Sequence, residues 1–246
     1  MAELSEQEIL EELKRFSTPS ITNVVATYPG NPLCLCLYEP WRSNWYTDQS
    51  VHCIYPELGR TVGYAVTMVR SLPDPGYKGF SYLDLIEALG ESKKPIVIVI
   101  QQDFPPEILP KVGMCGGQAT TLFQACGAVG VVSNGPNRDV DEIRSLKFQY
   151  MMSGVTPGHG PMAIRAINIP VSVAGMDVSP GDIIHMDEHG ACKFPADRLE
   201  DIYKNIIKLV KVEEEQAAAM SKAKTLEEIK AVYSTFLKIK TVGRSQ

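Results

Sequence analysis

The 246-residue sequence has no excess of basic residues and no cluster of them. It carries 24 Lys and Arg against 29 Asp and Glu, so its formal net charge is −5 and its pI is near 5.5. A protein that binds nucleic acid through the phosphates needs a positive field, which this composition does not supply. We therefore expect no nucleic-acid partner, and we expect a small anionic ligand to be held by a few local groups.

Long apolar runs are also missing. No stretch is long enough to span a membrane, and residues 1–16 (MAELSEQEILEELKRF) lack the basic region and apolar segment of a signal peptide. That segment has instead the acidic, amphipathic pattern of a helix with one apolar side. We expect a cytoplasmic protein with no membrane partner, built as one domain with extensions.

Cysteines are few and are not arranged in ligand-spaced pairs, which argues against a structural zinc site. Reduced, mostly buried thiols are the simpler interpretation. Cys34 and Cys36 occupy alternate positions of an apolar run, LCLCLY, and as part of a strand they would point to one face. Cys115 is the exception, because it lies beside a glycine loop where an anion site would favour a reactive thiolate.

The most informative stretch is 112–142, VGMCGGQATTLFQACGAVGVVSNGPNRDVDE. Gly113, Gly116 and Gly117 form a loop whose backbone can turn tightly and approach a ligand. A helix predicted over Ala119–Cys126 would direct its free N-terminal amides at an anion. This segment therefore predicts an anion site at the start of a helix.

Arg138 and Asp139 follow a β-branched strand predicted over residues 129–132 and a short polar turn. Open α/β sheets bind their ligands at the carboxyl ends of such strands. The planar fork of Arg138 suits a carboxylate, while the oxygens of Asp139 suit a divalent ion such as magnesium.

A plainer interpretation of the pair is also open. Arg138 and Asp139 could form a surface ion pair, or Asp139 and Asp141 could supply negative charge near the start of a helix predicted over residues 142–146. The residues alone do not separate this interpretation from a ligand site.

The order of these features resembles the RraA-like family, which includes 4-hydroxy-4-methyl-2-oxoglutarate aldolases and the regulator of ribonuclease E activity. The resemblance rests on the glycine loop, its helix, GAVGVV, the Arg-Asp turn and a later VSPGDIIHMDEHGACKFP. It covers residues 60–200, with a weaker echo at Phe16–Ala26.

This resemblance implies a lyase that depends on Mg²⁺ or Mn²⁺ and acts on small 2-oxo acids. The reaction would be retro-aldol cleavage to pyruvate or decarboxylation of oxaloacetate, through a metal-stabilised enolate. Arg138 and Asp139 would be the catalytic pair, with Asp139 on the metal and Arg138 on the substrate. The substrate carboxylate would also bind the backbone amides of Gly116, Gly117, Gln118 and Ala119. Trimers and hexamers are common in the family, which predicts a homotrimer or homohexamer.

Two positions depart from the family's pattern. In the aldolases an acidic residue stands where this chain has Gly117, and an N-terminal segment like SITNVV usually carries an acid where this chain has Asn23. Retro-aldol cleavage needs a base for a hydroxyl proton as well as a Lewis acid, whereas decarboxylation of a 2-oxo dicarboxylate needs only the Lewis acid. We therefore expect the chain to retain decarboxylation better than aldol cleavage.

Two other functions stay open beside the lyase. One is a non-catalytic RraA-like regulatory or binding protein, against which the intact Arg-Asp pair argues, and the other is an enzyme of altered chemistry on another small anionic substrate. In the later motif, the resemblance implies that Asp187 or Glu188 reaches the metal site of an adjacent subunit. Ordinary turn chemistry equally explains the DEHG sequence there.

The remaining pattern predicts an α/β protein. Strands are predicted at Thr61–Arg70, Ile96–Ile100, Tyr150–Val155 and Ala166–Ala174, with a helix at Tyr82–Leu89. Ile96–Ile100 is apolar on both faces and should be central. With the resemblance, we expect a layered α/β/β swivelling-type sandwich that has a central mixed sheet and helical N- and C-terminal extensions.

The expected domain organisation is an RraA-like α/β domain over residues 1–205 and a C-terminal helical extension over 206–246. An aromatic insertion occupies residues 28–58, either as a wall of the pocket or as a packing segment. The helical extension is expected to serve subunit contacts.

Overall fold

The computed structural model describes residues 4–28 and 30–240, with side chains as far as residue 236. Contacts divide the chain into two compact units. The first contains residues 1–18 and 44–196, and the second contains residues 19–43 and 197–246.

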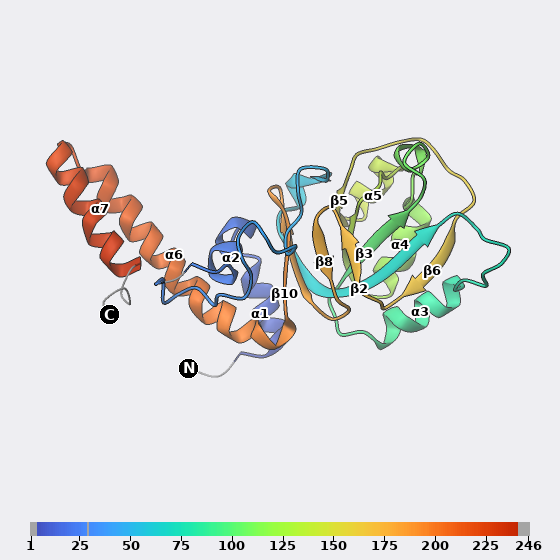
Figure 1. The fold of residues 1–246 in the computed structure, drawn as a ribbon, viewed down its shortest axis with the longest axis horizontal. Helices are drawn as coiled ribbons and strands as arrows, with labels where there is room; N and C mark the ends of the chain where they lie inside the picture. The colour runs from blue at the N-terminus through green and yellow to red at the C-terminus, as the bar shows by residue number, and fades with distance from the viewer. Residues whose placement is uncertain (1–3, 29, 241–246) are drawn as a thin grey trace. The chain divides into compact units, whose positions relative to one another are not determined.

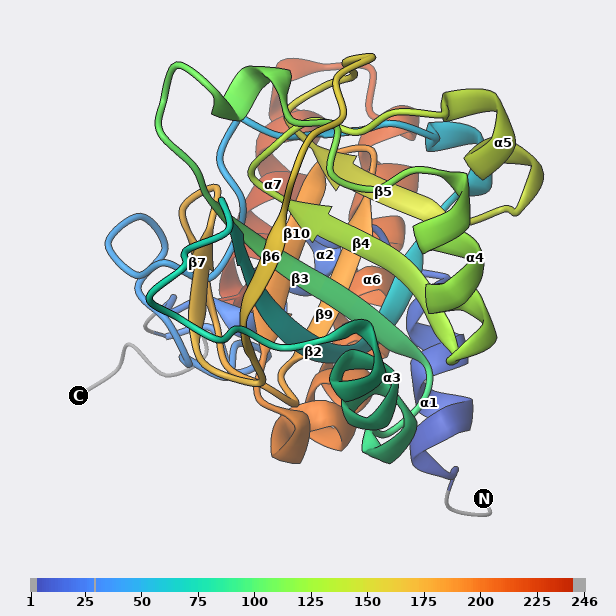
Figure 2. The same cartoon turned by 90° about the vertical axis from the view of Figure 1, so that its right-hand side faces the viewer.

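An eight-stranded mixed sheet forms the first unit (Figures 1 and 2). The strands follow the order β1-β5-β4-β3-β2-β9-β10, and β6 pairs with the second half of β2, beyond the part that pairs with β9. Strands β2 to β5 are parallel, whereas β1, β6, β9 and β10 join antiparallel. The bounds are β1 His52–Cys53, β2 Thr61–Ser71, β3 Ile96–Asp103, β4 Ala128–Ser133, β5 Gln149–Met152, β6 Ala163–Ile167, β9 Ile183–Asp187 and β10 Gly190–Phe194.

Three helices connect successive parallel strands: α3 Tyr82–Glu91, α4 Gly117–Ala125 and α5 Val140–Ser145. A fourth helix of this unit, α1 Glu6–Leu13, precedes the sheet in the chain. Helices α1 and α3 each begin with a capping box, formed by Ser5 with Glu8 and by Ser81 with Asp84. Such boxes satisfy amides that a helix start would otherwise leave unpaired, so they fix where these helices begin.

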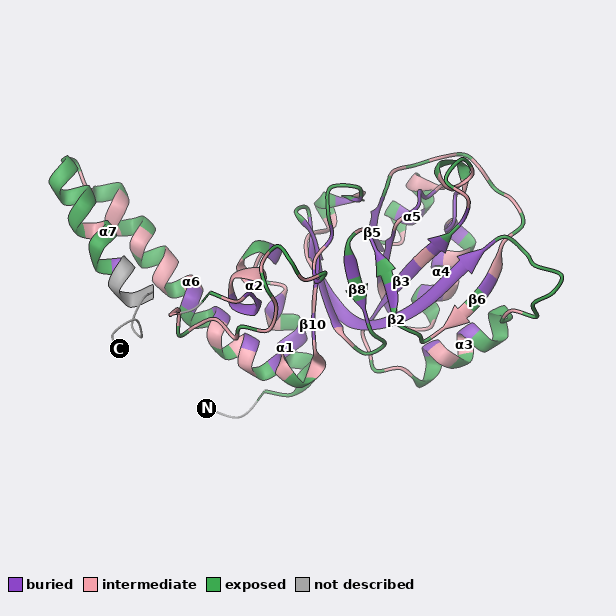
Figure 3. Ribbon diagram, viewed as in Figure 1, coloured by how far each residue is buried: buried purple, intermediate pink, exposed green. Residues whose placement is uncertain are grey.

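The core lies on both faces of the sheet. Along β3, Ile96, Ile98 and Ile100 pack with α3, α4 and α5, while Val97 and Val99 pack on the opposite face. There the second layer is the hairpin of β7 (Val171–Val173) and β8 (Met176–Val178). Figure 3 shows β2 buried along its length, and β3 is buried over Ile96–Ile100. This arrangement confirms the expected α/β/β sandwich and the central place of β3.

Two of the predicted strands are wrong in extent. Ala166–Ala174 is not one strand, because β6 ends at Ile167 and β7 begins at Val171. Asn168 between them has a φ of 53°, a left-handed conformation outside the range of regular strands, and Pro170 has no amide hydrogen to donate. Likewise β5 ends at Met152, short of the predicted Val155.

The second unit is mainly helical. It contains most of α2 (Thr18–Val25) together with α6 (Leu199–Lys222) and α7 (Leu226–Lys240), so the predicted helical extension is confirmed over its described residues. Helix α6 passes through residues 205 and 206 without a break. A domain boundary at that point stays a prediction, as does the role of the aromatic insertion.

Cys34 and Cys36 do not lie in a strand. Leu35 and Leu37 donate hydrogen bonds to the carbonyls of Val24 and Val25 at the end of α2, at 2.7 and 2.9 Å. Cys36 between them has a φ of 53°, which interrupts an extended chain, and its side chain is exposed.

None of the helices in the described residues is long and apolar enough to cross a membrane. The cytoplasmic location stays a prediction.

Candidate active site

A cavity of about 820 Å³ is lined by segments that follow the carboxyl ends of three parallel strands. Tyr82 comes after β2, the loop and first turn of α4 after β3, and Arg138, Asp139 and Glu142 after β4. This is the edge at which open α/β sheets bind ligands. The structure therefore brings the glycine loop and the Arg-Asp pair to one cavity, as the sequence predicts.

Asp139 has an unusual backbone conformation for a residue with a side chain. It stands at the N-cap of α5 with φ 60° and ψ 44°, and it makes no side-chain cap of that helix. Its Oδ2 instead accepts a hydrogen bond from the amide of Gly117, the first residue of α4, at 3.0 Å. Backbone strain at a non-glycine residue gathers at functional sites. The Asp139 side chain therefore does not cap α5, although Asp141 does place negative charge in the first turn of that helix.

The guanidinium of Arg138 lies beside this carboxylate. Its Nε is 3.6 Å from Oδ2 of Asp139, and both side chains are 31% exposed. In the described part of the chain, no further acceptor bonds the guanidinium and no donor bonds Oδ1 of Asp139. The pair therefore keeps a planar donor fork and a carboxylate oxygen for a ligand.

Three glycines make this approach possible. A Cβ built on Gly116 would lie 2.2 Å from Oδ2 of Asp139, and one on Gly113 would lie 2.4 Å from the carbonyl oxygen of Gly158 and 3.2 Å from Cδ of Arg138. A Cβ on Gly117 would lie 2.1 Å from Oε2 of Glu142. Each of these three loop positions is a glycine because another group occupies the space of a side chain there. That group is a side chain of the Arg138–Glu142 segment or the backbone of Gly158.

The first amides of α4 differ in their partners. The Gly117 amide is used by Asp139, whereas no acceptor among the described residues bonds the amides of Gln118 and Ala119. The two unbonded amides also gain from the positive end of the helix dipole. Their predicted role in binding a substrate carboxylate remains a prediction.

Sequence reasoning did not single out Glu142 or Tyr82. Glu142 stands three residues after Asp139 on the first turn of α5, and that spacing places two side chains on one side of a helix. Tyr82 begins α3, and its ring lies 5.3 Å from the guanidinium of the buried Arg70. His159, from the turn-rich GVTPGHGP segment, lines the cavity too.

Cys115 is not the reactive thiol that its position predicted. Its side chain is 1% exposed and lies in the apolar core under α4. Burial raises the pKa of the Cys115 thiol, against an opposing effect of the Arg70 charge. The thiol form is therefore favoured, and the expectation of a thiolate is wrong.

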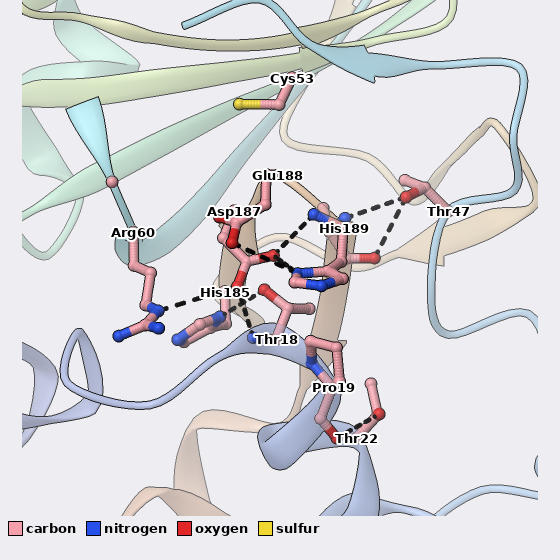
Figure 4. A network of polar contacts seen from close by, with 12 residues as sticks. Thr18, Pro19, Thr22, Thr47, Cys53, Arg60, His185, Asp187, Glu188 and His189 are labelled. Atoms are coloured by element: carbon pink, nitrogen blue, oxygen red, sulfur yellow. Dashed lines mark hydrogen bonds and ion pairs between the residues drawn. The ribbon is translucent and has the colours of Figure 1, made fainter. Parts of the chain in front are cut away.

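The DEHG turn has its own polar network (Figure 4). The buried Asp187 carboxylate accepts hydrogen bonds from the Thr18 amide at 2.7 Å and the His189 amide at 2.9 Å. Although burial raises the pKa of Asp187, these hydrogen bonds bring it below its usual value. Asp187, Glu188 and His189 offer ligand atoms within 4.8 Å of one another.

Turn chemistry accounts for one oxygen of Asp187, which the His189 amide bonds, and the Thr18 amide bonds the other. Glu188 is half exposed beside a second cavity of about 610 Å³. The expectation that an acidic residue of this turn reaches an adjacent subunit stays a prediction.

Comparison with known proteins decides the family. A family model described as RraA-like (Aldolase/RraA) matches residues 38–192, which is more than half of the chain. The chain belongs to the RraA-like family. The recognition made from the glycine loop and the Arg-Asp turn is thereby confirmed.

Two relatives illustrate the range of the matches. "Uncharacterized protein MJ0644" of Methanocaldococcus jannaschii is 30% identical over 144 residues, which are 58% of this chain and 64% of that protein. A 4-hydroxy-4-methyl-2-oxoglutarate aldolase of Thermus thermophilus is 28% identical over 86 residues, 35% of this chain and 52% of the enzyme. The chain thus spans less than two thirds of the length of either relative. The family therefore includes proteins named as aldolases.

Solved structures agree on the fold. Streptomyces coelicolor RraAS2, described as an unusual member of the RNase ES inhibitor RraA protein family, superposes with a TM-score of 0.60 at 19% identity, covering 88% of this chain and 99% of its own. A protein from Pseudomonas syringae superposes with a TM-score of 0.67 at 18% identity, covering 94% and 96%. At such identities the likeness concerns the fold alone.

Proposed function

We propose that this RraA-like protein is a divalent-metal-dependent lyase of small 2-oxo acids. The observation that supports it is the Arg138-Asp139 pair, which lies in a cavity with the first amides of α4; among the described residues, Oδ1 of Asp139 and the Gln118 and Ala119 amides have no hydrogen-bond partner. Arg138 binds the substrate carboxylate with its planar fork, and the Gln118 and Ala119 amides bind the same group.

The charges of the cavity fit a divalent cation. Its charged side chains are one arginine and two carboxylates, Arg138 against Asp139 and Glu142, so they carry a net negative charge. An anionic substrate would be repelled by that charge alone. Mg²⁺ and Mn²⁺ prefer oxygen ligands, and Mg²⁺ commonly takes one or two carboxylates and keeps several waters. Asp139 would hold the ion directly.

When bound, the ion supplies Lewis-acid stabilisation of the negative charge that develops on the 2-oxo oxygen. The protein's own groups fix the geometry of the reaction. Arg138 and the α4 amides would hold the substrate carboxylate in the cavity beside Asp139. Either a carboxylate leaves as carbon dioxide, or a C–C bond breaks to release pyruvate.

The test measures pyruvate release from oxaloacetate and from 4-hydroxy-4-methyl-2-oxoglutarate, with and without magnesium. Because oxaloacetate also decarboxylates with free metal, only a rate that Asp139→Asn abolishes counts. Asparagine tolerates the left-handed backbone of residue 139, so Asp139→Asn removes the charge without adding strain. Asp139→Ala removes the charge and also strains the backbone. Equal background rates for wild type and both variants would refute the lyase, and attention would pass to other anionic substrates or protein partners.

We also infer a homotrimer or homohexamer. Four apolar side chains of α6 and α7, Ile207, Leu226, Ile229 and Tyr233, are 40% to 59% exposed. Such exposure on helices is common at subunit contacts. Light scattering at several protein concentrations tests this inference, and a monomer throughout would refute it.

A further inference from the structure

Glu142 has no explanation as a helix cap. It stands at the third position of α5, where a glutamate commonly bonds back to the N-cap amide. Asp139 and Glu142 form no such capping box, and no donor among the described residues bonds the Glu142 carboxylate. The side chain instead extends to the start of α4 and lines the cavity.

The position of its carboxylate is specific. Oε2 of Glu142 lies 2.1 Å from the place of a Cβ on Gly117, and Cδ lies 3.3 Å from it. The Glu142 carboxylate therefore fills the space that the first atoms of a side chain at 117 would take. On the neighbouring glycine, Oδ2 of Asp139 lies 2.2 Å from the place of a Cβ on Gly116. The two carboxylates thus occupy the side-chain positions of two consecutive glycines.

These two carboxylates differ in their surroundings. Asp139 accepts a hydrogen bond from the Gly117 amide and lies 3.6 Å from Arg138, which fixes its carboxylate in a position to hold a cation. Glu142 is free of protein partners in the described residues and faces the cavity. A carboxylate that accepts and returns a proton needs that freedom, because its bonding changes during the reaction.

We propose that the Glu142 carboxylate is the general base that removes the hydroxyl proton of a 4-hydroxy-2-oxo acid, a role that rests on the proposed lyase function. The carboxylate takes the proton of the 4-hydroxyl group, the C3–C4 bond breaks, and C4 becomes a carbonyl. The electron pair of that bond passes to C3 and the 2-oxo group as an enolate. Glu142 then returns the proton to C3, which gives pyruvate without any other reactant.

This assignment replaces the expectation that Gly117 leaves the site without a base. The acidic group is supplied from α5 instead of from the start of α4. Wild type should then catalyse aldol cleavage, and the preference for decarboxylation should belong to a variant that lacks the Glu142 carboxylate.

The experiment compares Glu142→Gln with Asp141→Asn. Asp141 is the neighbouring acid, its side chain is 98% exposed, and it pairs with Arg144 outside the cavity, so it controls for loss of one charge on the same helical turn. General-base catalysis contributes about 100-fold or more to a rate. We expect Glu142→Gln to lose about 100-fold in kcat for cleavage of 4-hydroxy-4-methyl-2-oxoglutarate. The ratio of its cleavage rate to its oxaloacetate decarboxylation rate should fall by about tenfold or more. In Asp141→Asn, both kcat for cleavage and this ratio should stay within about twofold of wild type.

A double variant moves the carboxylate back to residue 117. Gly117 has no left-handed φ, so an aspartate is accepted there once the Glu142 side chain is shortened. Glu142→Ala should lose cleavage, and Gly117→Asp with Glu142→Ala should recover about tenfold of it or more. Cleavage by Glu142→Gln within about threefold of wild type, or an equal loss in Asp141→Asn, would overturn the proposal.

Titration of Mn²⁺ alone separates failure of this proposal from failure of the lyase. A carboxylate beside a bound ion supports its affinity by about tenfold. Glu142→Gln should therefore weaken Mn²⁺ binding by about that factor, while Asp141→Asn should not. If wild type shows no Asp139-dependent turnover, the lyase and the proton transfer both fall. A loss of Mn²⁺ affinity specific to Glu142→Gln would then still place Glu142 beside the metal site. An unchanged Mn²⁺ affinity in Glu142→Gln would show that Glu142 is not part of that site.

Discussion

Replacing Gly116 with alanine tests the site through its shape. The backbone of Gly116 has φ −106° and ψ −173°, which alanine adopts without strain. The added methyl group would lie 2.2 Å from Oδ2 of Asp139 and 3.0 Å from Nε of Arg138. Real Cβ atoms essentially never lie within 3.0 Å of another heavy atom, so the Asp139 carboxylate must move away by about 1 Å. Its hydrogen bond from the Gly117 amide, now 3.0 Å long, would break.

The cost follows from that bond. A hydrogen bond to a charged group contributes about 1.5 to 3 kcal/mol. At about 1.4 kcal/mol per factor of ten, the Gly116→Ala variant should lose about 10- to 150-fold in Mn²⁺ affinity and in kcat/KM. Calorimetric titration of Mn²⁺ and Asp139-dependent pyruvate release measure the two quantities.

A matched glycine serves as the control. Gly90 in α3 has open space around the position of its Cβ, so Gly90→Ala should leave the site unchanged and raise the free energy of unfolding by about 0.5 to 1 kcal/mol. Mn²⁺ affinity of Gly116→Ala within about twofold of wild type would refute the steric argument. So would an equal loss in Gly90→Ala.

Three further results are expected. Burial lowers the pKa of His185 to about 4 from 6.5. Between these two values the unfolded chain binds a proton at His185 that the folded chain does not. The free energy of unfolding is therefore unaffected by His185 above pH 6.5 and declines as the pH falls toward 4. The decline amounts to about 3 kcal/mol in urea titrations, and His185→Gln should flatten it; an equal slope in that variant would contradict the assignment. Arg138→Lys keeps the charge but loses the planar fork, so KM for oxaloacetate should rise about tenfold with a smaller change in kcat, and an unchanged KM would show that Arg138 does not bind the substrate. Iodoacetamide should label the exposed Cys36 of the folded protein and spare the buried Cys115, as peptide mass spectrometry can measure, and early labelling of Cys115 would contradict its burial.

Local pattern was sufficient for the sheet and for part of the site. The apolar run at Ile96–Ile100 predicted a central strand because both faces of β3 are buried, and the turn after β4 predicted where Arg138 and Asp139 lie because parallel strands end at one edge. These features depend on neighbours in sequence. The family resemblance added the expected chemistry but not the contacts.

Tertiary contacts decided what the sequence did not predict. The loss of an acid at Gly117 looked like the loss of a group, yet Glu142 fills that space from a different helix. The residue type at position 117 cannot show this, because Gly117 and Glu142 are 25 positions apart in the chain. Asn168 interrupts the strand predicted over Ala166–Ala174 through a left-handed backbone conformation, which apolar alternation does not indicate.

The principal groups of the candidate site come from one run of the chain, Gly113–Glu142, folded as loop, α4, β4 and α5. Short loops close at low entropic cost, so this segment can form its contacts early during folding, before the antiparallel strands β9 and β10 arrive from the far end of the sequence. Exchange of the α4 and β4 amides with deuterium should then slow in the same early phase of refolding as exchange in β3. The cavity would then take its shape during folding before β9 and β10 complete the sandwich.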